Sequence, residues 1–276
     1  MSTLREIVYN SVIAIHRRTG KEWIPLKEIY EEVDKNRDVG INNGGSSVRA
    51  ALETHSALSE VFSGTEEYIL KEKGSCLYKS IYYDQIKFIN NMNIGDVFTR
   101  DQLMAIFKIS GQSGIMKTNS LNCLVLTTSE KNGVYGDSLV ENGFITYTGE
   151  GLTGDQTITK NNKTIYKSNE NDLPMYLFSK DNNKKYIFEG QVKLCAEPYQ
   201  VVEKDIDGND RLVWKFPLSI VYSNDYNFEK DEKFSKIVYE ITEIESKVYS
   251  DMIEEQNDLE YKEGKINIRK YRKTDK

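Results

Sequence analysis

Hydrophobic positions near the start of the chain recur with the period of an α-helix. From residue 4 to residue 16, apolar side chains return every three or four positions, and the pattern ends near Gly20. A second amphipathic pattern follows at once. Its first residue is predicted to be Pro25, because the fixed φ of proline and its missing N–H suit the first position of a helix. The opening of the chain therefore predicts two consecutive amphipathic helices.

A third helix and a hairpin are predicted after a break that is rich in glycine. We expect Ser46 to cap this helix, since its hydroxyl can accept from a free backbone N–H of the first turn. Two short strand patterns follow, and the pair Lys73-Gly74 lies between them as the predicted turn. Three helices followed by a β-hairpin form the plan of a winged helix-turn-helix, which we predict for residues 1–80.

The pattern changes in the middle of the chain. Residues 81–91 are predicted to form a linker helix. From Gly95 onwards, short apolar or alternating runs are separated by glycine, asparagine and aspartate, as in a compact strand-rich domain or barrel. One further helix is expected at residues 100–108, capped by Thr99. We therefore predict a strand-rich domain over residues 92–222.

The last part of the chain has the pattern of one long helix. Beyond residue 222, apolar residues return every seven positions and form a stripe with acidic flanks. Such a stripe can pair two chains in a coiled coil, which would make a homodimer, or it can pack on its own domain. Residues 223–276 are predicted as a C-terminal helix followed by a basic tail, and both ways of covering the stripe remain open.

Composition and charge narrow the classes of function. The 276 residues are enough for two domains, and 37 Lys and Arg stand against 43 Asp and Glu. No predicted domain is basic overall, so a nucleic-acid surface would have to be a local face. No apolar run is long enough to cross a membrane, and three separated cysteines do not form a disulfide framework. We expect a cytoplasmic protein without membrane partners or cofactors.

Histidine chemistry is also scarce. The chain has only His16 and His55, both in helical patterns, where we interpret them as structural. Histidine-dependent triads, metal sites and nucleases are therefore not expected. A Mg²⁺-dependent nuclease that uses carboxylates and lysine needs no histidine, and residues 245–247 spell the matching Glu-Ser-Lys triplet. Because this triplet lies in the predicted long helix rather than on a strand, we predict no catalytic residues, no metal site and no enzyme.

The stretch from residue 122 to residue 168 carries the most informative motifs. Its blocks are, in order, Leu124-Val125-Leu126, Tyr135-Gly136-Asp137, Tyr147-Thr148-Gly149-Glu150-Gly151, Asp155-Gln156-Thr157-Ile158-Thr159 and Asn162-Lys163. Together they resemble the SRA (SET and RING-associated) family, whose members read modified cytosine in DNA, and the likeness covers roughly residues 92–222. The arrangement also resembles bacterial modification-dependent restriction proteins. The implied fold is an α+β chain with a winged helix, an SRA/PUA-like β-barrel domain and a long C-terminal helix.

The resemblance implies that a base is flipped out of the duplex and held by the protein. Extrusion costs a few kcal/mol of stacking, which aromatic faces can replace. Tyr135 and Tyr147 would sandwich the base, and Thr148 would meet its Watson–Crick edge; the alternative is that the tyrosines are ordinary strand aromatics. Many relatives have an acidic residue where this chain has Ser138, and Asp137 could substitute only if the loop shifts. A methylated, hydroxymethylated or otherwise altered cytosine therefore remains open.

Other residues are implied as contacts to the DNA. Gln112, Ser113 and Lys117 lie where the family has a loop that invades the duplex, although a plain surface loop is the alternative. Asn162 and Lys163 would lie at a helix start, where they could contact a phosphate, and helix capping is the alternative. The groove-facing candidates on the third helix are Ser46, Ser47 and Arg49.

These expectations combine into one leading hypothesis. The chain is predicted to be a non-catalytic reader of double-stranded DNA that carries modified cytosine, in restriction or phage defence. The nuclease segment that is rich in His and Asn in the restriction proteins is missing from this sequence, so a separate nuclease is the expected effector partner. The alternatives are a Mg²⁺-dependent nuclease of modified DNA and a winged-helix transcriptional regulator whose barrel senses a small molecule.

Overall fold

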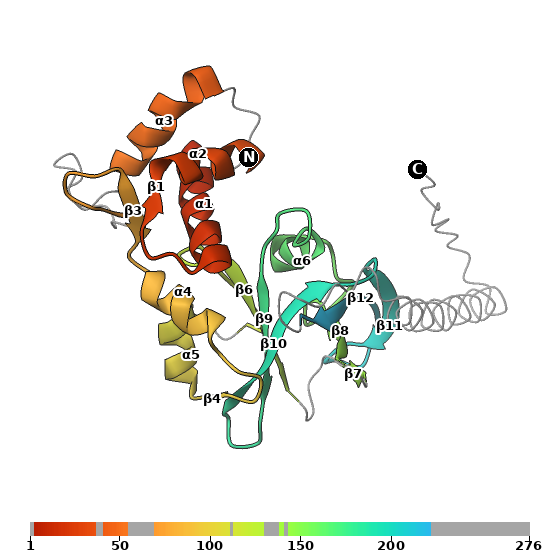
Figure 1. Ribbon diagram of the computed structural model, residues 1–276. Coiled ribbons are helices and arrows are strands. Elements are labelled where there is room, and N and C mark those ends of the chain that lie inside the picture. The colour runs from red at the N-terminus through yellow and green to blue at the C-terminus, as the bar shows by residue number, and fades with distance from the viewer. Residues whose placement is uncertain are drawn as a thin grey trace. The chain divides into compact units, whose positions relative to one another are not determined.

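The computed structural model describes residues 3–36, 41–54, 69–110, 113–129, 138–140 and 143–221 (Figure 1). These residues belong to two compact units. The first unit holds the described residues up to 129 together with residues 170–192, and the second holds residues 138–169 and 193–221. Tyr135, Asp137, Gln112, His55 and the predicted C-terminal helix lie outside the described residues.

Three helices open the first unit. They are α1 (Leu4–Thr19), α2 (Leu26–Asn36) and α3 (Ile41–Thr54). A capping box begins α1, in which the Thr3 hydroxyl accepts from the Glu6 N–H and the Glu6 carboxylate accepts from the Thr3 N–H. The helix ends at Gly20, whose φ of 67° is the left-handed conformation that glycine adopts without strain. The predicted bounds of α1 are thus confirmed at its C-terminal end.

A small antiparallel sheet follows the helices. Its strands β1 (Ile24–Pro25), β3 (Leu77–Ser80) and β2 (Ile69–Lys71) lie in that order. Strands β2 and β3 form the predicted hairpin, and Gly74 lies in its turn with a φ of 77°. The fold of the chain is therefore mixed α+β, while the winged helix stays a prediction.

Two predicted helix starts are wrong. Pro25 lies in β1 and pairs with Leu77, so α2 begins one residue later; an edge strand tolerates a proline because its missing N–H leaves no ladder bond unmade. Ser46 lies inside α3 rather than at its cap. Helix α3 extends back through two glycines because the burial of Val48 and Leu52 outweighs the low helix propensity of glycine.

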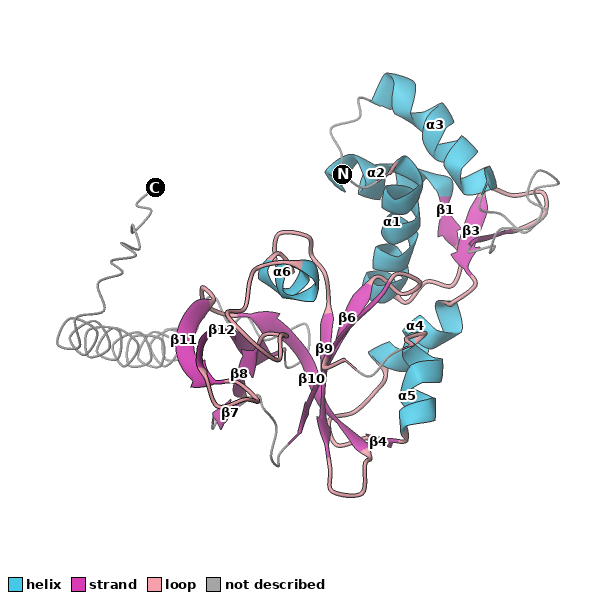
Figure 2. Cartoon of the chain, turned by 180° about the vertical axis from the view of Figure 1, so that it is seen from behind, coloured by secondary structure: helices cyan, strands magenta, loops and turns pink. Residues whose placement is uncertain are grey.

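The remainder of the first unit packs two helices with a sheet. Helices α4 (Tyr83–Asn90) and α5 (Arg100–Phe107) were both predicted, and they lie side by side in Figures 1 and 2. Thr99 caps α5 through a second capping box with Gln102, as predicted. The sheet strands, in spatial order, are β5 (Ile115–Thr118), β6 (Cys123–Ser129), β9 (Met175–Lys180) and β10 (Tyr186–Leu194), and β4 (Val97–Phe98) pairs with β10. Only the β6–β9 pairing among these is parallel.

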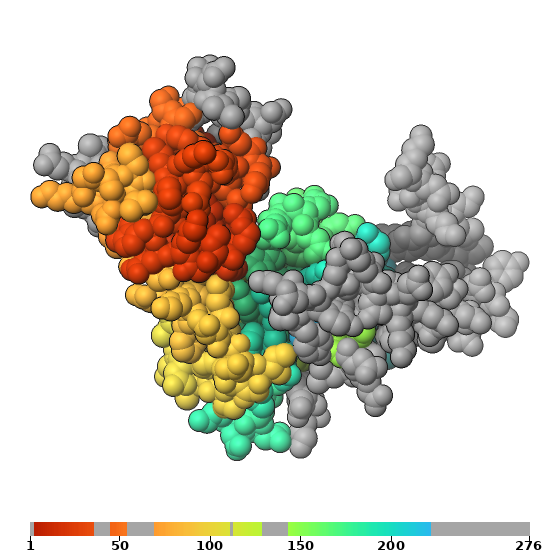
Figure 3. Space-filling view, in the orientation of Figure 1, coloured from red at the N-terminus to blue at the C-terminus, as the bar shows by residue number. Residues whose placement is uncertain are grey.

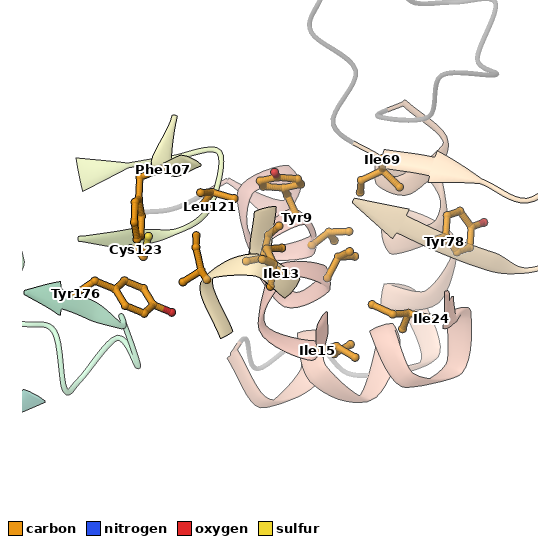
Figure 4. Packing of buried hydrophobic residues seen from close by; sticks show 14 of the residues in the cluster. Tyr9, Ile13, Ile15, Ile24, Ile69, Tyr78, Phe107, Leu121, Cys123 and Tyr176 are labelled. Atoms are coloured by element: carbon orange, nitrogen blue, oxygen red, sulfur yellow. The ribbon is translucent and has the colours of Figure 1, made fainter. Parts of the chain in front are cut away.

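The core of the first unit joins its helices to this sheet. Figure 4 shows Ile13 of α1 in the cluster, which also includes Phe107 and Tyr176. His16 of α1 is 1% exposed, donates from Nδ1 to the Lys21 carbonyl at 2.7 Å and accepts at Nε2 from the Ser80 N–H at 2.9 Å. Burial lowers the pKa of His16, so the ring stays neutral at pH 7. Its part is structural, as the sequence indicated.

The second unit is a sheet with one helix against it. The sheet strands, in spatial order, are β7 (Ser138–Val140), β8 (Phe144–Thr148), β12 (Asp210–Ile220) and β11 (Tyr199–Lys204), and all three pairings are antiparallel. Helix α6 (Lys160–Tyr166) contacts β12, where Tyr166 meets Trp214 edge to face with the ring centroids 6.3 Å apart. The strands confirm the strand-rich pattern that was predicted for this region. Nowhere in the part of the chain that the structure describes is a helix long and apolar enough to span a bilayer.

Candidate functional site

The predicted base-contacting residues lie where β8 ends. Tyr147 and Thr148 are its last two residues, and both are buried, with 3% of each exposed. Thr148 lies directly opposite Lys215 of β12, and the next residue, Gly149, donates its N–H to the Trp214 carbonyl at 2.8 Å. The turn that follows, Tyr147–Gly151, therefore begins as a continuation of the sheet.

Gln156 ties this turn to β12. Its Nε2 donates to the Gly149 carbonyl at 2.6 Å and lies 3.4 Å from the Gly151 carbonyl, while its Oε1 accepts from the Trp214 N–H at 2.9 Å. The side chain is 4% exposed. Because an amide can donate and accept at once, Gln156 satisfies backbone groups on both sides of the turn, which a glutamate could not do.

Asn162 of α6 holds the same turn from the other side. Its Oδ1 accepts from the Glu150 N–H at 2.8 Å, and its Nδ2 donates to the Glu150 carbonyl at 3.0 Å and the Thr157 carbonyl at 3.1 Å. Only 2% of the residue is exposed. The side chain that was predicted to meet a phosphate thus uses its hydrogen bonds inside the protein, and Thr159, not Asn162, is the N-cap of α6. Lys163, the next residue, is exposed.

Gly149 completes this clamp. A Cβ at that position would lie 2.8 Å from Gln156 Oε1 and 2.9 Å from Asn162 Oδ1, which is closer than real Cβ contacts. The two amides can approach the backbone only because no side chain stands between them. Gly149, Gln156 and Asn162 are therefore one device, which we call the turn clamp, and it holds the backbone of Gly149–Gly151, directly after Tyr147 and Thr148.

A buried lysine orients the Thr148 hydroxyl. Lys215 is 5% exposed, and its Nζ donates to Thr148 Oγ1 at 2.8 Å and to Glu203 Oε1 at 2.5 Å. Since the hydroxyl oxygen accepts from an ammonium group, the hydroxyl proton is directed away from Lys215. Sequence reasoning missed Lys215 and Glu203. The available signal was a charged residue in the middle of the apolar run of β12.

The other predicted residues are dispersed. Ser138 pairs with Thr146 across β7 and β8, so its backbone lies two residues from Thr148 along the sheet. Ser113 and Lys117 are exposed residues of the first unit. Tyr135, one of the two rings of the predicted base slot, lies outside the described residues, so the slot stays a prediction.

The candidates on α3 present an exposed face. Ser46, Ser47 and Arg49 are all exposed. Arg49 Nε donates to Glu53 Oε1 at 3.0 Å, and Lys71 of β2 lies 3.3 Å from the same oxygen. Arg49 and Lys71 thus share the one carboxylate of Glu53.

Of the three cysteines, Cys123 is buried, Cys195 is half-buried and Cys76 is exposed. Burial raises the pKa of Cys123 to about 12 and that of Cys195 to about 11, so neither thiol ionises at neutral pH. Among the residues that the structure describes, no cluster of three His, Cys, Asp or Glu side chains could hold a metal ion. The arrangement around the turn clamp is suited to recognition by hydrogen bonds.

Several solved structures are similar to the chain. The ScoMcrA structure described as a type IV phosphorothioation-dependent restriction endonuclease is similar with a TM-score of 0.50 and 13% identity, over 80% of this chain and 53% of that chain. The sulfur binding domain and SRA domain of ScoMcrA, complexed with phosphorothioated DNA, gives 0.49 and 14% over 80% and 85%. The SUVH5 SRA domain, complexed with methylated CHH DNA, gives 0.39 and 26% over 49% and 92%.

Family membership follows from the sequence itself. No curated protein matches the chain. The sequence pattern of one family, described as ScoMcrA-like, SRA domain, matches residues 94–243. This span contains the Tyr147–Gly151 turn, Gln156, Asn162 and Lys215, which the structure brings together. Because the match extends over more than half of the 276 residues, the chain belongs to the ScoMcrA-like SRA domain family.

Proposed function

We propose that the protein is a non-catalytic reader of modified DNA that receives an extruded base at the Tyr147–Gly151 turn. The observation that carries the proposal is the turn clamp, which holds the backbone directly after Tyr147 and Thr148, in a chain that belongs to a family of SRA domains. The neighbours that bind phosphorothioated or methylated DNA support the same class of ligand. A preformed, rigid turn favours recognition because little conformational entropy is lost on binding.

The orientation of Thr148 suggests how a base would be read. Its oxygen accepts a hydrogen bond from Lys215, so its proton is directed away from the ammonium group, and we propose that it donates to the base. A donor at this position matches N3 or O2 of cytosine, which are acceptors on the Watson–Crick edge. The ring of Tyr147 and the ring of Tyr135 would replace the stacking that the extruded base loses, which is worth about 1–3 kcal/mol per base.

Further residues are proposed as contacts to DNA phosphates. We propose Lys163, on the surface of the second unit that α6 forms (green in Figure 3), together with Gln112, Ser113 and Lys117. Asn162 would act indirectly, through the turn that it holds. We further propose that α1 to α3 with their small sheet form a winged helix, whose groove-facing residues are Ser46, Ser47 and Arg49.

The modified base and the effector belong to the same proposal. We infer that the base is a modified cytosine, that a separate nuclease acts on the bound DNA in restriction or phage defence, and that residues 223–276 pair two chains. The similarity to the ScoMcrA restriction endonuclease supports the link to restriction, and this chain spans about half of that chain's length.

Binding measurements test the function directly. Affinities of the full chain are measured by fluorescence anisotropy for matched duplexes with plain cytosine, 5-methylcytosine, 5-hydroxymethylcytosine or a phosphorothioate link. We expect a preference of at least tenfold, corresponding to about 1.4 kcal/mol, for one modified duplex over the plain one. Equal affinity for all four duplexes would contradict the proposal.

Two variants assign the preference to the site. Tyr135→Ala should weaken binding of the preferred duplex by at least about 1 kcal/mol, because one stacking face is lost. Thr148→Val should also weaken binding of the preferred duplex, since a donor to the base is removed. Thr164→Val on α6 is the matched control, because its hydroxyl donates to the Lys160 carbonyl on its own helix and we expect it to leave affinity unchanged.

A further inference from the structure

Arg211 is a buried arginine whose hydrogen bonds are incomplete. It lies near the start of β12, with 2% of the residue exposed. Its Nη1 donates to the Gly151 carbonyl, at the end of the turn that the clamp holds. Within the described part of the chain, its Nε and Nη2 are buried and have no hydrogen-bond partner. A guanidinium group that is withdrawn from water in this way is costly unless something completes it.

The two unused donors form a geometric unit. In the planar guanidinium group, Nε–H and one Nη2–H point away from the same edge, and this edge matches two oxygens of a phosphate or carboxylate group. The bond from Nη1 to Gly151 fixes the plane of the group. Arg211 therefore presents an oriented fork rather than a mobile charge.

The neighbouring carboxylates do not fill this fork. Glu203 of β11 lies directly opposite Arg211 in the strand register, yet its carboxylate binds Lys215. Asp155 accepts from the Leu212 N–H, and Asp210 pairs with Lys204. One face of the β11–β12 pair thus carries two buried cations, Arg211 and Lys215, and the single carboxylate of Glu203.

We propose that the Nε–Nη2 edge of Arg211 is a bidentate site for an oxyanion and that a phosphate group of the bound DNA occupies it. This proposal rests on the proposed function, since Gly151 belongs to the same turn as Tyr147 and Thr148. A phosphate supplies the missing negative charge and two acceptor oxygens in a shielded site, where charge-assisted hydrogen bonds are strongest. Leu152 and Gly154, just after Gly151, are exposed, and this short turn is where we place the entry of the ligand.

The same pair of oxygens occurs in an acidic substituent of a base, such as a 5-carboxyl group. The first experiment therefore uses inorganic phosphate alone. The Nε–H NMR resonance of Arg211 is assigned by comparing the full chain with Arg211→Lys, in whose spectrum this resonance is missing. The variant keeps the positive charge but has no guanidinium fork. We expect phosphate, and not chloride at matched ionic strength, to shift this resonance in a saturable manner. An Nε–H resonance that responds equally to both salts would overturn the site.

The second experiment identifies the source of the oxygens. A duplex in which a neutral methylphosphonate replaces one phosphate beside the modified base should bind the wild-type chain at least about tenfold more weakly. Arg211→Lys should bind the normal duplex as weakly and show no further loss with the methylphosphonate. Lys204→Gln, which removes an exposed charge from the same strand pair, is the matched control and should retain the difference.

The outcomes separate this inference from the proposed function. If the chain prefers a 5-carboxylcytosine duplex, loses that preference in Arg211→Lys and shows no methylphosphonate effect, the fork binds the base and not the backbone. This result would overturn the phosphate assignment. Modified-duplex binding that is unaffected by Arg211→Lys would overturn the inference and leave the proposed function intact. A chain that binds no DNA would remove the proposed function, while the phosphate titration would still decide whether the fork binds an oxyanion.

Discussion

The two units of the molecule bury charge in opposite ways. In the first unit, Glu32 of α2 is 6% exposed and accepts from both Nη atoms of Arg18, at 3.0 and 2.8 Å, and from Lys35 at 3.1 Å. One buried carboxylate has two cations, whose side chains reach solvent. In the second unit the buried charged groups are the cations Arg211 and Lys215. The carboxylate of Glu203 binds Lys215, and the Nε–Nη2 edge of Arg211 has no carboxylate among the described residues.

The difference indicates which charges serve the fold and which serve a ligand. A buried charge is tolerated when its hydrogen bonds are complete, and Glu32 meets that condition. Arg211 does not, because two of its donors are unmatched among the described residues. An uncompensated buried charge costs stability, so it is expected where binding requires it. If the β11–β12 face binds the DNA as proposed, Arg211 lowers the stability of the second unit in favour of binding.

The largest effect is expected from Lys215→Met. The change leaves the Glu203 carboxylate and the Thr148 hydroxyl without their shared donor in a buried position. Breaking a buried ion pair from one side typically costs several kcal/mol, and we expect the free energy of unfolding to fall by about 3 kcal/mol. Urea unfolding followed by circular dichroism measures it. Lys204→Met, in the exposed pair with Asp210, should change it by less than about 1 kcal/mol, and similar losses in both variants would contradict the comparison.

A pair of glycine substitutions should have opposite signs in the two units. Gly149→Ala places a methyl group within 2.9 Å of both clamp amides, so the clamp must open, and we expect a loss of about 2 kcal/mol. Gly45→Ala in α3 places it 3.8 Å from the Tyr30 ring, which is ordinary contact, and should stabilise the helix by up to about 1 kcal/mol. Equal effects of the two variants on urea unfolding would show that the turn is not clamped.

Local signals made much of the fold predictable. Gly20 ended α1 and Thr99 began α5 because capping is decided by residues within one turn of the helix. Pro25 was misplaced because its strand partner, Leu77, lies far along the chain and sequence periodicity does not show such pairing. Ser46 was misplaced because packing of α3 overrode the helix-breaking tendency of glycine.

The site was predicted only in part, for the same physical reason. The motifs drew attention to Tyr147, Thr148 and Asn162, but the turn clamp depends on hydrogen bonds between residues up to 58 positions apart. Lys215 and Arg211 were missed because burial of a charge is set by the cross-strand register, which places Glu203 opposite Arg211 and Lys215 opposite Thr148. The position of Lys215 within the apolar run of β12 was a local signal, but this run does not show the partners across the sheet that bury the charge.

The complete charge cluster of the first unit should be sensitive to acid. Hydrogen bonds from Arg18, foremost, hold the pKa of Glu32 below its ordinary value of 4.5. The stabilisation is therefore present above pH 4.5 and is lost as the pH falls through the lower pKa of the folded state. Glu32→Gln should cost about 1–2 kcal/mol at pH 7 and should flatten the dependence of unfolding free energy on pH below 4.5. An unchanged acid profile in the variant would assign the acid sensitivity to other carboxylates.

The smallest change in the free energy of unfolding is expected from a substitution of Arg211, whose proposed effect on DNA binding is large. Arg211→Met removes a buried cation without a counter-charge and keeps most of its volume, at the expense of one hydrogen bond to Gly151. Because the desolvation penalty and the lost bond oppose each other, we expect the free energy of unfolding to change by less than about 1 kcal/mol. The same variant should lose affinity for modified DNA, as Arg211→Lys does. A loss of stability as large as that of Lys215→Met would show that Arg211 is a structural residue. Buried charge would then serve the fold in both units.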